Sequence, residues 1–164
     1  MTRSRNALVI VILMALVTAG GSTFAAEDKL FYENRGDIPE QYRWDLGHIF
    51  PGIDDWEAAY SKVEAEIPEL AAYQGRLGES ADVMFVATEL LNDISKTLGD
   101  IYVYAGQLQR TDTRDAEANA LVGRAQALYA AFGQATAYFE PEIVQLPVAT
   151  IAAYLDDPRL KTYA

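Results

Sequence analysis

Apolar residues recur every three or four positions along two long stretches of this chain, residues 80–110 and 114–139. This period places them on one face of an α-helix, whereas a strand would alternate its faces. The repeating positions are Val83, Val86, Leu90, Ile94, Leu98, Ile101, Ala105 and Leu108, then Leu121, Ala125, Leu128, Phe132, Ala135 and Phe139. The pattern predicts two antiparallel helices that share an apolar seam.

A short polar turn separates these two predicted helices. Thr111, Asp112 and Thr113 carry short side chains that can accept hydrogen bonds from the free N–H groups at the start of the second helix. Asp112 and Asp115 flank the turn, where negative charge near a helix N-terminus is favoured. We therefore predict that these carboxylates cap a helix, with paired-acid chemistry as the alternative.

A third helix is predicted before the hairpin. Asp54 or Asp55 can cap it, and apolar residues repeat at helical spacing over residues 56–73. Pro68 falls inside this run and should kink or interrupt the helix. Gly75 stands where a left-handed residue commonly ends a helix.

Residues 26–53 have no helical period and predict an extended arm before the helices. The arm includes an aromatic segment, from which we expect Trp44, Leu46 and Phe50 to bury themselves in the grooves between the helices. On the hairpin we expect Tyr104 to lie in the core, with Tyr102 on another face, and Phe139 to be a further packing anchor. These five anchors are Trp44, Leu46, Phe50, Tyr104 and Phe139.

The last part of the chain predicts short helical segments. Glu140 and Glu142 flank Pro141 and mark a helix end, although two close carboxylates could also act as an acid–base pair. Pro147 suits the first turn of a short helix over residues 148–155. A final helix is expected from Asp157-Pro158, and it stops after two turns, so the helical region 54–164 looks truncated at its C-terminus.

The first 25 residues have the pattern of a secretory signal peptide: basic residues, an apolar run over residues 7–17, and a tail of small residues. Cleavage after Ala25 places small side chains where they are required. The alternative is an uncleaved membrane anchor, but the run is too short to cross a hydrocarbon core of about 30 Å. We expect an exported protein, periplasmic or extracellular, without a stable membrane anchor.

Composition limits the partners and the chemistry. Cleavage would remove two of the 13 basic side chains and none of the 24 acidic ones, so the formal charge would fall from −11 to −13. Such a chain repels phosphate backbones, and no nucleic-acid partner is expected. With one histidine and no cysteine, the chain lacks the ligands of a catalytic zinc site. We expect the single histidine, His48, to be a partly exposed residue beside Trp44 and Phe50.

Four segments of the chain, in this order and with fitting gaps, resemble the N-terminal region of oligoendopeptidase F, a member of the thimet-oligopeptidase-like zinc metallopeptidases. They are YRWDLGHIFPGIDDWEAAY (Tyr42–Tyr60), LAAYQGRLGES (Leu70–Ser80), IYVYAGQLQRTDTRD (Ile101–Asp115) and AYFEPEIVQLP (Ala137–Pro147). The resemblance covers residues 38–164.

This resemblance implies that the chain is an all-α part of a larger helical peptidase fold. In the full-length family a separate C-terminal catalytic region binds zinc through an H-E-x-x-H helix and hydrolyses short peptides. The N-terminal region forms a wall or lid of the substrate channel. No catalytic or metal residue can be transferred to this chain, which should bind no zinc and be inactive without the catalytic region. The alternative is a free-standing exported helical module that binds a peptide or a protein without catalysis.

Overall fold

The computed structural model describes residues 32, 33 and 35–163, which divide into two units after Pro39. The described part of the first unit contains one 3₁₀ turn, η1 (Arg35–Asp37). The second unit contains η2 (Glu40–Tyr42), α2 (Ile53–Glu66), η3 (Ile67–Tyr73), α3 (Ala81–Thr111), α4 (Ala116–Thr136), α5 (Phe139–Gln145), α6 (Val148–Tyr154) and η4 (Leu160–Tyr163). No strand occurs among the described residues, so the all-α prediction is confirmed.

The expected signal peptide and its cleavage point at Ala25 lie outside the described residues. Within the part that the structure describes, no helix is both long enough and apolar enough to cross a membrane.

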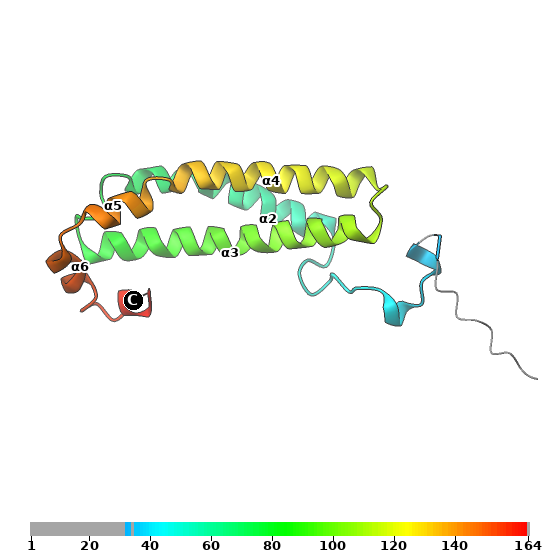
Figure 1. Cartoon of the computed structure of the whole chain (residues 1–164), viewed down its shortest axis with the longest axis horizontal. Helices are drawn as coiled ribbons and strands as arrows, with labels where there is room; N and C mark the ends of the chain where they lie inside the picture. Colours follow the sequence, from blue (N-terminus) through cyan, green and yellow to red (C-terminus); the bar gives the residue numbers. More distant parts are fainter. Residues whose placement is uncertain (1–31, 34, 164) are drawn as a thin grey trace, which may run out of the picture. The chain divides into compact units, whose positions relative to one another are not determined.

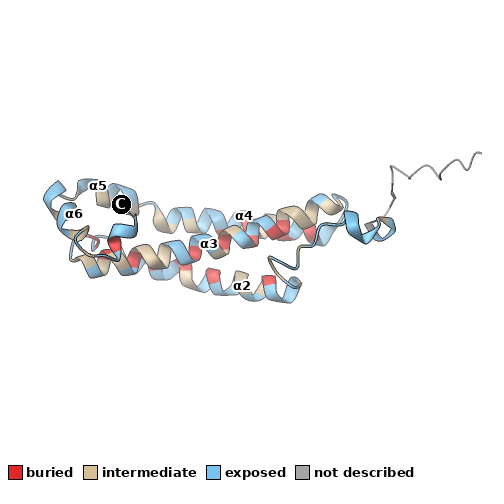
Figure 2. Ribbon diagram, turned by 90° about the horizontal axis from the view of Figure 1, so that it is seen from below, coloured by how far each residue is buried: buried red, intermediate tan, exposed pale blue. Residues whose placement is uncertain are grey.

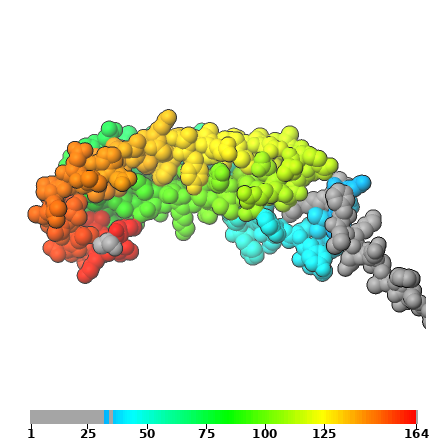
Figure 3. Space-filling model, in the orientation of Figure 1, coloured from blue at the N-terminus to red at the C-terminus, as the bar shows by residue number. Residues whose placement is uncertain are grey.

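The predicted hairpin is confirmed: α3 and α4 run antiparallel, and α2 packs along the same pair (Figure 1). The buried residues lie on the sides of these helices that face one another, and the outer sides are exposed (Figure 2). The space-filling view shows α4 lying along α3 (Figure 3). The buried residues of this main core are Trp56, Val63, Ile67, Leu70, Ile94, Leu98, Ile101, Tyr104, Ala105, Leu121, Ala125 and Leu128.

Trp56 joins α2 to the hairpin. Its indole is fully buried, and its Nε1–H donates to the carbonyl oxygen of Ile101 on α3 over 2.9 Å. The ring also stacks on Tyr60, with 5.3 Å between the two centroids. Because a buried indole N–H needs a partner, this bond fixes how α2 lies on α3.

The helix ends agree in part with the sequence predictions. Ser80 caps α3 by accepting from the Val83 N–H, and Asp115 caps α4 by accepting from the N–H groups of Glu117 and Ala118. The expected cap from Thr111, Asp112 or Thr113 is wrong. Thr111 is the last residue of α3, and its hydroxyl donates to its own helix. The Asp112 side chain accepts instead from Arg114.

The expected side-chain cap of α2 is also wrong. Gly52 occupies the N-cap position, and no side chain caps the helix. Asp54 and Asp55 lie within the first turn of the helix, where their charge favours the N-terminus.

Pro68 and Gly75 act as predicted. The α-helix ends at Glu66, and the following residues continue as the 3₁₀ helix η3, because Pro68 supplies no N–H for an α-helical bond. Gly75 then has a φ of +78°, a backbone conformation that residues other than glycine rarely adopt.

The aromatic segment before α2 behaves differently from the prediction. The Leu46 carbonyl accepts from the N–H groups of Ile49 and Phe50, and the resulting turn presents Leu46 and Phe50 to the main core. The Phe50 ring meets the buried Tyr104 edge-on, with 5.5 Å between centroids. Trp44 precedes the turn and is 58% exposed, so its expected burial is wrong. His48 is exposed, 3.5 Å from an Asp45 oxygen.

The end of the chain is less helical than predicted. α4 stops at Thr136, so Phe139 belongs to α5 and not to the hairpin. Instead of a two-turn α-helix after Asp157, the structure has the 3₁₀ turn η4. The Asp157 carbonyl accepts from the N–H groups of Leu160 and Lys161, which begins this turn.

Candidate functional site

A second, smaller core lies where the hairpin meets the last helices. Its buried residues are Leu77, Met84, Ala87 and Leu160, and Phe139, Ile143, Leu146 and Tyr154 pack against it. It therefore joins the loop after η3, the first turns of α3, and the segments α5, α6 and η4. The pocket that we take as the candidate site lies at this second core.

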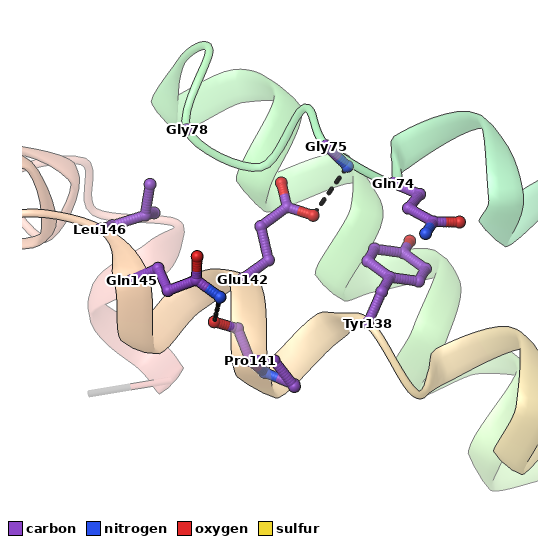
Figure 4. A pocket seen from close by; sticks show the side chains of 8 residues that line it. All are labelled: Gln74, Gly75, Gly78, Tyr138, Pro141, Glu142, Gln145 and Leu146. Atoms are coloured by element: carbon purple, nitrogen blue, oxygen red, sulfur yellow. Dashed lines mark hydrogen bonds between the residues drawn. The ribbon is translucent and has the colours of Figure 1, made fainter.

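The pocket is an open hollow of about 480 Å³ between the loop after η3 and α5 (Figure 4). Backbone and side chains from both segments line it. These residues are Gln74, Gly75, Gly78, Tyr138, Pro141, Glu142, Gln145 and Leu146.

Glu142 fixes one wall of the pocket. Its carboxylate accepts from the Gly75 N–H over 2.7 Å and from the Leu77 N–H over 2.6 Å. The left-handed conformation of Gly75 belongs to the same loop. A charged acceptor that receives two backbone N–H groups makes strong bonds. Glu142 thus holds the loop in place across 67 residues of sequence.

Two tyrosines tie η3 and the loop after it to the C-terminal segments. Tyr138 donates its hydroxyl to the Leu70 carbonyl, and Tyr154 donates to the Gly78 carbonyl, each over 2.7 Å. Burial, together with the nearby charge of Glu142, raises the pKa of Tyr138 above its usual range. The hydroxyl therefore keeps its proton and remains a donor.

Two polar side chains of the pocket, Glu142 and Gln145, are bonded to backbone groups. The Glu142 carboxylate is held by backbone, and Gln145 donates to the Pro141 carbonyl over 3.1 Å. No pair of side chains here has the geometry of a nucleophile with its base. The remaining lining includes Pro141 and Leu146, so the pocket suits an apolar side chain better than a reacting group.

The carboxylates considered as acid pairs are not brought together in that way. Glu140 is exposed, whereas Glu142 turns to the loop. Asp115 caps α4, and Asp112 bonds to Arg114, which lowers the pKa of Asp112 to about 2. Asp115 therefore caps a helix as predicted, whereas Asp112 pairs with Arg114 and caps none. Glu140 and Glu142 lie in the first turn of α5 and do not mark a helix end, so that part of the prediction is wrong.

The contacts of Arg124 between α2 and α4, which we call the Arg124 cluster, were not predicted from the sequence. The Arg124 guanidinium lies over the rings of Trp56 and Tyr60, 4.9 and 4.4 Å from their centroids. It also bonds both oxygens of Glu57, and this bond lowers the pKa of Glu57. Spacing along α4 gave no signal for the cluster, because its members come from separate helices.

The described residues do not form a metal-binding site. Across residues 32, 33 and 35–163, no group of three or more His, Asp or Glu side chains could hold a metal ion. The zinc that the family resemblance implies therefore has no set of ligands in this part of the chain.

Two solved peptidase structures share this helical fold. No family model matches the chain. The crystal structure of oligoendopeptidase-F from Enterococcus faecium has a TM-score of 0.64 at 28% identity, over 68% of this chain and 22% of that protein. A Chlamydophila abortus protein of known structure has a TM-score of 0.72 at 25% identity, over 79% of this chain and 22% of its own.

Sequence relatives agree with the structural ones. The plasmid-encoded oligoendopeptidase F of Lactococcus lactis subsp. cremoris is 32% identical over 133 residues, 80% of this chain. Oligopeptidase PepF of Bacillus subtilis is 31% identical over 146 residues, 88% of this chain. The chain spans about 22% of the length of each. Over most of its length the chain is therefore similar to part of oligoendopeptidase F, and the resemblance drawn from the four segments is confirmed.

Proposed function

We propose that this chain is the N-terminal helical part of an exported zinc oligopeptidase and forms a wall or lid of the channel in which short peptides are hydrolysed. The observation that carries the proposal is the match to oligoendopeptidase F over 80% of this chain and about 22% of the relative. Catalytic and zinc-binding residues would come from a further region of the enzyme.

The residues of the chain favour a wall over a catalyst. Asp115 caps a helix, Asp112 pairs with Arg114, and Glu142 holds the loop after η3. Glu140 is exposed and points to no such partner, so these carboxylates form no acid–base pair poised for hydrolysis. A long packed hairpin is instead a rigid surface, suited to bounding a channel. Such a wall would exclude folded proteins and admit short peptides.

A chimera tests the proposal. In oligopeptidase PepF of Bacillus subtilis, the segment that matches this chain over 146 residues would be replaced by the corresponding residues of this chain. We expect the chimera to hydrolyse a fluorogenic short peptide and to leave a folded protein intact, while this chain alone hydrolyses neither. A soluble, folded chimera without peptidase activity would contradict the proposal.

Export is tested separately. Expression of the full chain in a bacterial host, followed by fractionation and mass spectrometry, should yield an exported product that begins at Ala26. A product that keeps residues 1–25 and stays in the cell would contradict the export proposal, and it would leave the peptidase proposal standing.

A further inference from the structure

The bend between α5 and α6 carries the most exposed of the large apolar side chains in the described part of the chain. Val144 is 76% exposed and Val148 is 85% exposed, one on each side of the bend at Leu146–Pro147. No charged side chain lies between Glu142 and Asp156. Val144, Pro147 and Val148 together form what we call the elbow surface, an uncharged patch on a strongly acidic chain.

The elbow surface continues into the pocket. Pro141 lines the pocket and stands three residues before Val144 on α5, so the two are neighbours on the helix surface. The hollow of about 480 Å³ therefore opens beside Val144. An exposed apolar patch next to a hollow is a combination typical of an interface, in which a partner's apolar side chain enters the hollow.

The position of the last described residues indicates what covers this surface. Leu160 of η4 is buried in the second core, against which Tyr154 of α6 also packs. Figure 1 shows the C-terminal end beside α6. Polypeptide that continued from this point, as in a longer relative, would start next to the elbow surface. Tethering of this kind raises the effective concentration of the following region at the patch.

We propose that the elbow surface is the docking site for the remaining region of the full-length peptidase, which meets it with an uncharged apolar face. This inference rests on the proposed function. It specifies that the elbow surface is where the two regions meet. It also proposes that an apolar side chain of the other region occupies the pocket.

Hydrogen exchange measured on the chimera and on this chain alone tests the docking site. Amides of residues 139–154 should exchange at least tenfold more slowly in the chimera, because docking covers them there. Amides around Leu98 in the main core serve as the internal control and should exchange equally in both proteins.

Variants of the chimera test the side chains. Val144→Asp combined with Val148→Asp should return the exchange of residues 139–154 to within twofold of the rate in the chain alone. Val103→Asp is the matched control, since Val103 on α3 is also exposed, at 46%, and lies outside the elbow surface. Val144→Gln with Val148→Gln repeats the test with a smaller perturbation, and circular dichroism of each variant in the chain alone checks the fold.

The outcomes separate this inference from the proposed function. An active chimera whose elbow amides exchange as fast as in the chain alone would overturn the docking site and leave the peptidase proposal standing. Equal effects from Val103→Asp would overturn it too. Protection of the elbow in the chain alone that grows with protein concentration would show that a second copy covers the surface, which also overturns the inference. An inactive chimera counts against the proposed function.

Discussion

Glu142 shows how a single side chain positions a loop that is distant in sequence. Its two oxygens accept from the N–H groups of Gly75 and Leu77, which lie in the loop after η3. Hydrogen bonds to a charged group contribute about 1.5–3 kcal/mol each to stability, and a partly buried donor left without a partner is costly.

Glu142→Ala should lower the free energy of unfolding by about 2 kcal/mol, because both loop N–H groups lose their acceptor. The stability of Glu142→Gln should lie between that of Glu142→Ala and that of the parent chain, since the amide keeps one acceptor oxygen. Glu140→Ala is the control: Glu140 is an exposed neighbour on the same helix, and its loss should change stability by less than about 0.5 kcal/mol. Urea unfolding followed by circular dichroism measures all three. Equal effects of Glu140→Ala and Glu142→Ala would contradict the role of Glu142.

Asp112 gives a pH-dependent prediction at the same scale. The hydrogen bonds from Arg114 lower the pKa of Asp112 from 3.8 to about 2 in the folded chain. Because the folded-state pKa is the lower one, the stabilising pair is present above pH 3.8 and is lost as the pH falls toward 2. An NMR titration of the carboxyl carbon should find the low value. In Arg114→Gln the pKa should rise part of the way toward 3.8, because the guanidinium is lost while the backbone N–H of residue 114 still donates to Asp112. An unchanged titration would refute the side-chain pairing.

At the scale of elements, two glycines have opposite roles. Gly75 has a φ of +78°, which a Cβ disfavours. Gly123 lies inside α4, where an added Cβ would meet nothing within 4 Å. Glycine in a helix interior costs roughly 0.5–1 kcal/mol relative to alanine, so only the first glycine is required by the backbone.

Gly123→Ala should therefore raise the free energy of unfolding by about 0.5–1 kcal/mol, and Gly75→Ala should lower it by about 1 kcal/mol. The same substitution with opposite signs makes each variant the control for the other. Thermal and urea unfolding of the two variants provide the comparison. A stabilising Gly75→Ala would show that the loop does not need its left-handed residue.

The elements could be predicted because their signals are local. The helical period gave α3 and α4, Pro68 gave the change from α-helix to η3, and Gly75 gave the turn that follows. The partners of Glu142 and Arg124 could not be predicted, because each contact joins residues 67 apart and depends on how separate helices pack. The exposure of Trp44 could not be predicted either, because apolar character predicts burial only on average.

At the scale of the second unit, two cores share one helix. The main core lies between α2, α3 and α4, and the second core surrounds the first turns of α3. The second core has only four buried residues, Leu77, Met84, Ala87 and Leu160. A core that small contributes less apolar burial, so we expect it to open without unfolding of the main core.

Leu77→Ala and Leu98→Ala test this division, because each removes a fully buried leucine from a different core. Substitutions of this kind cost about 2–5 kcal/mol. Hydrogen exchange should accelerate in α5, α6 and η4 for Leu77→Ala, while the middle of α4 keeps its protection. Leu98→Ala should accelerate exchange throughout. Uniform acceleration by Leu77→Ala would mean that the two cores unfold as one.

The arrangement of contacts along the chain also sets an order of folding. Helices α3 and α4 are adjacent in sequence, so the hairpin closes over a short turn. The contacts that hold the second core are distant: Leu77 with Glu142 is separated by 65 residues, and Asp82 with Arg159 by 77. Closing such long loops costs entropy before any contact compensates for it, and this slows folding. During synthesis the hairpin can therefore form while the loop after η3 still waits for Glu142 to leave the ribosome.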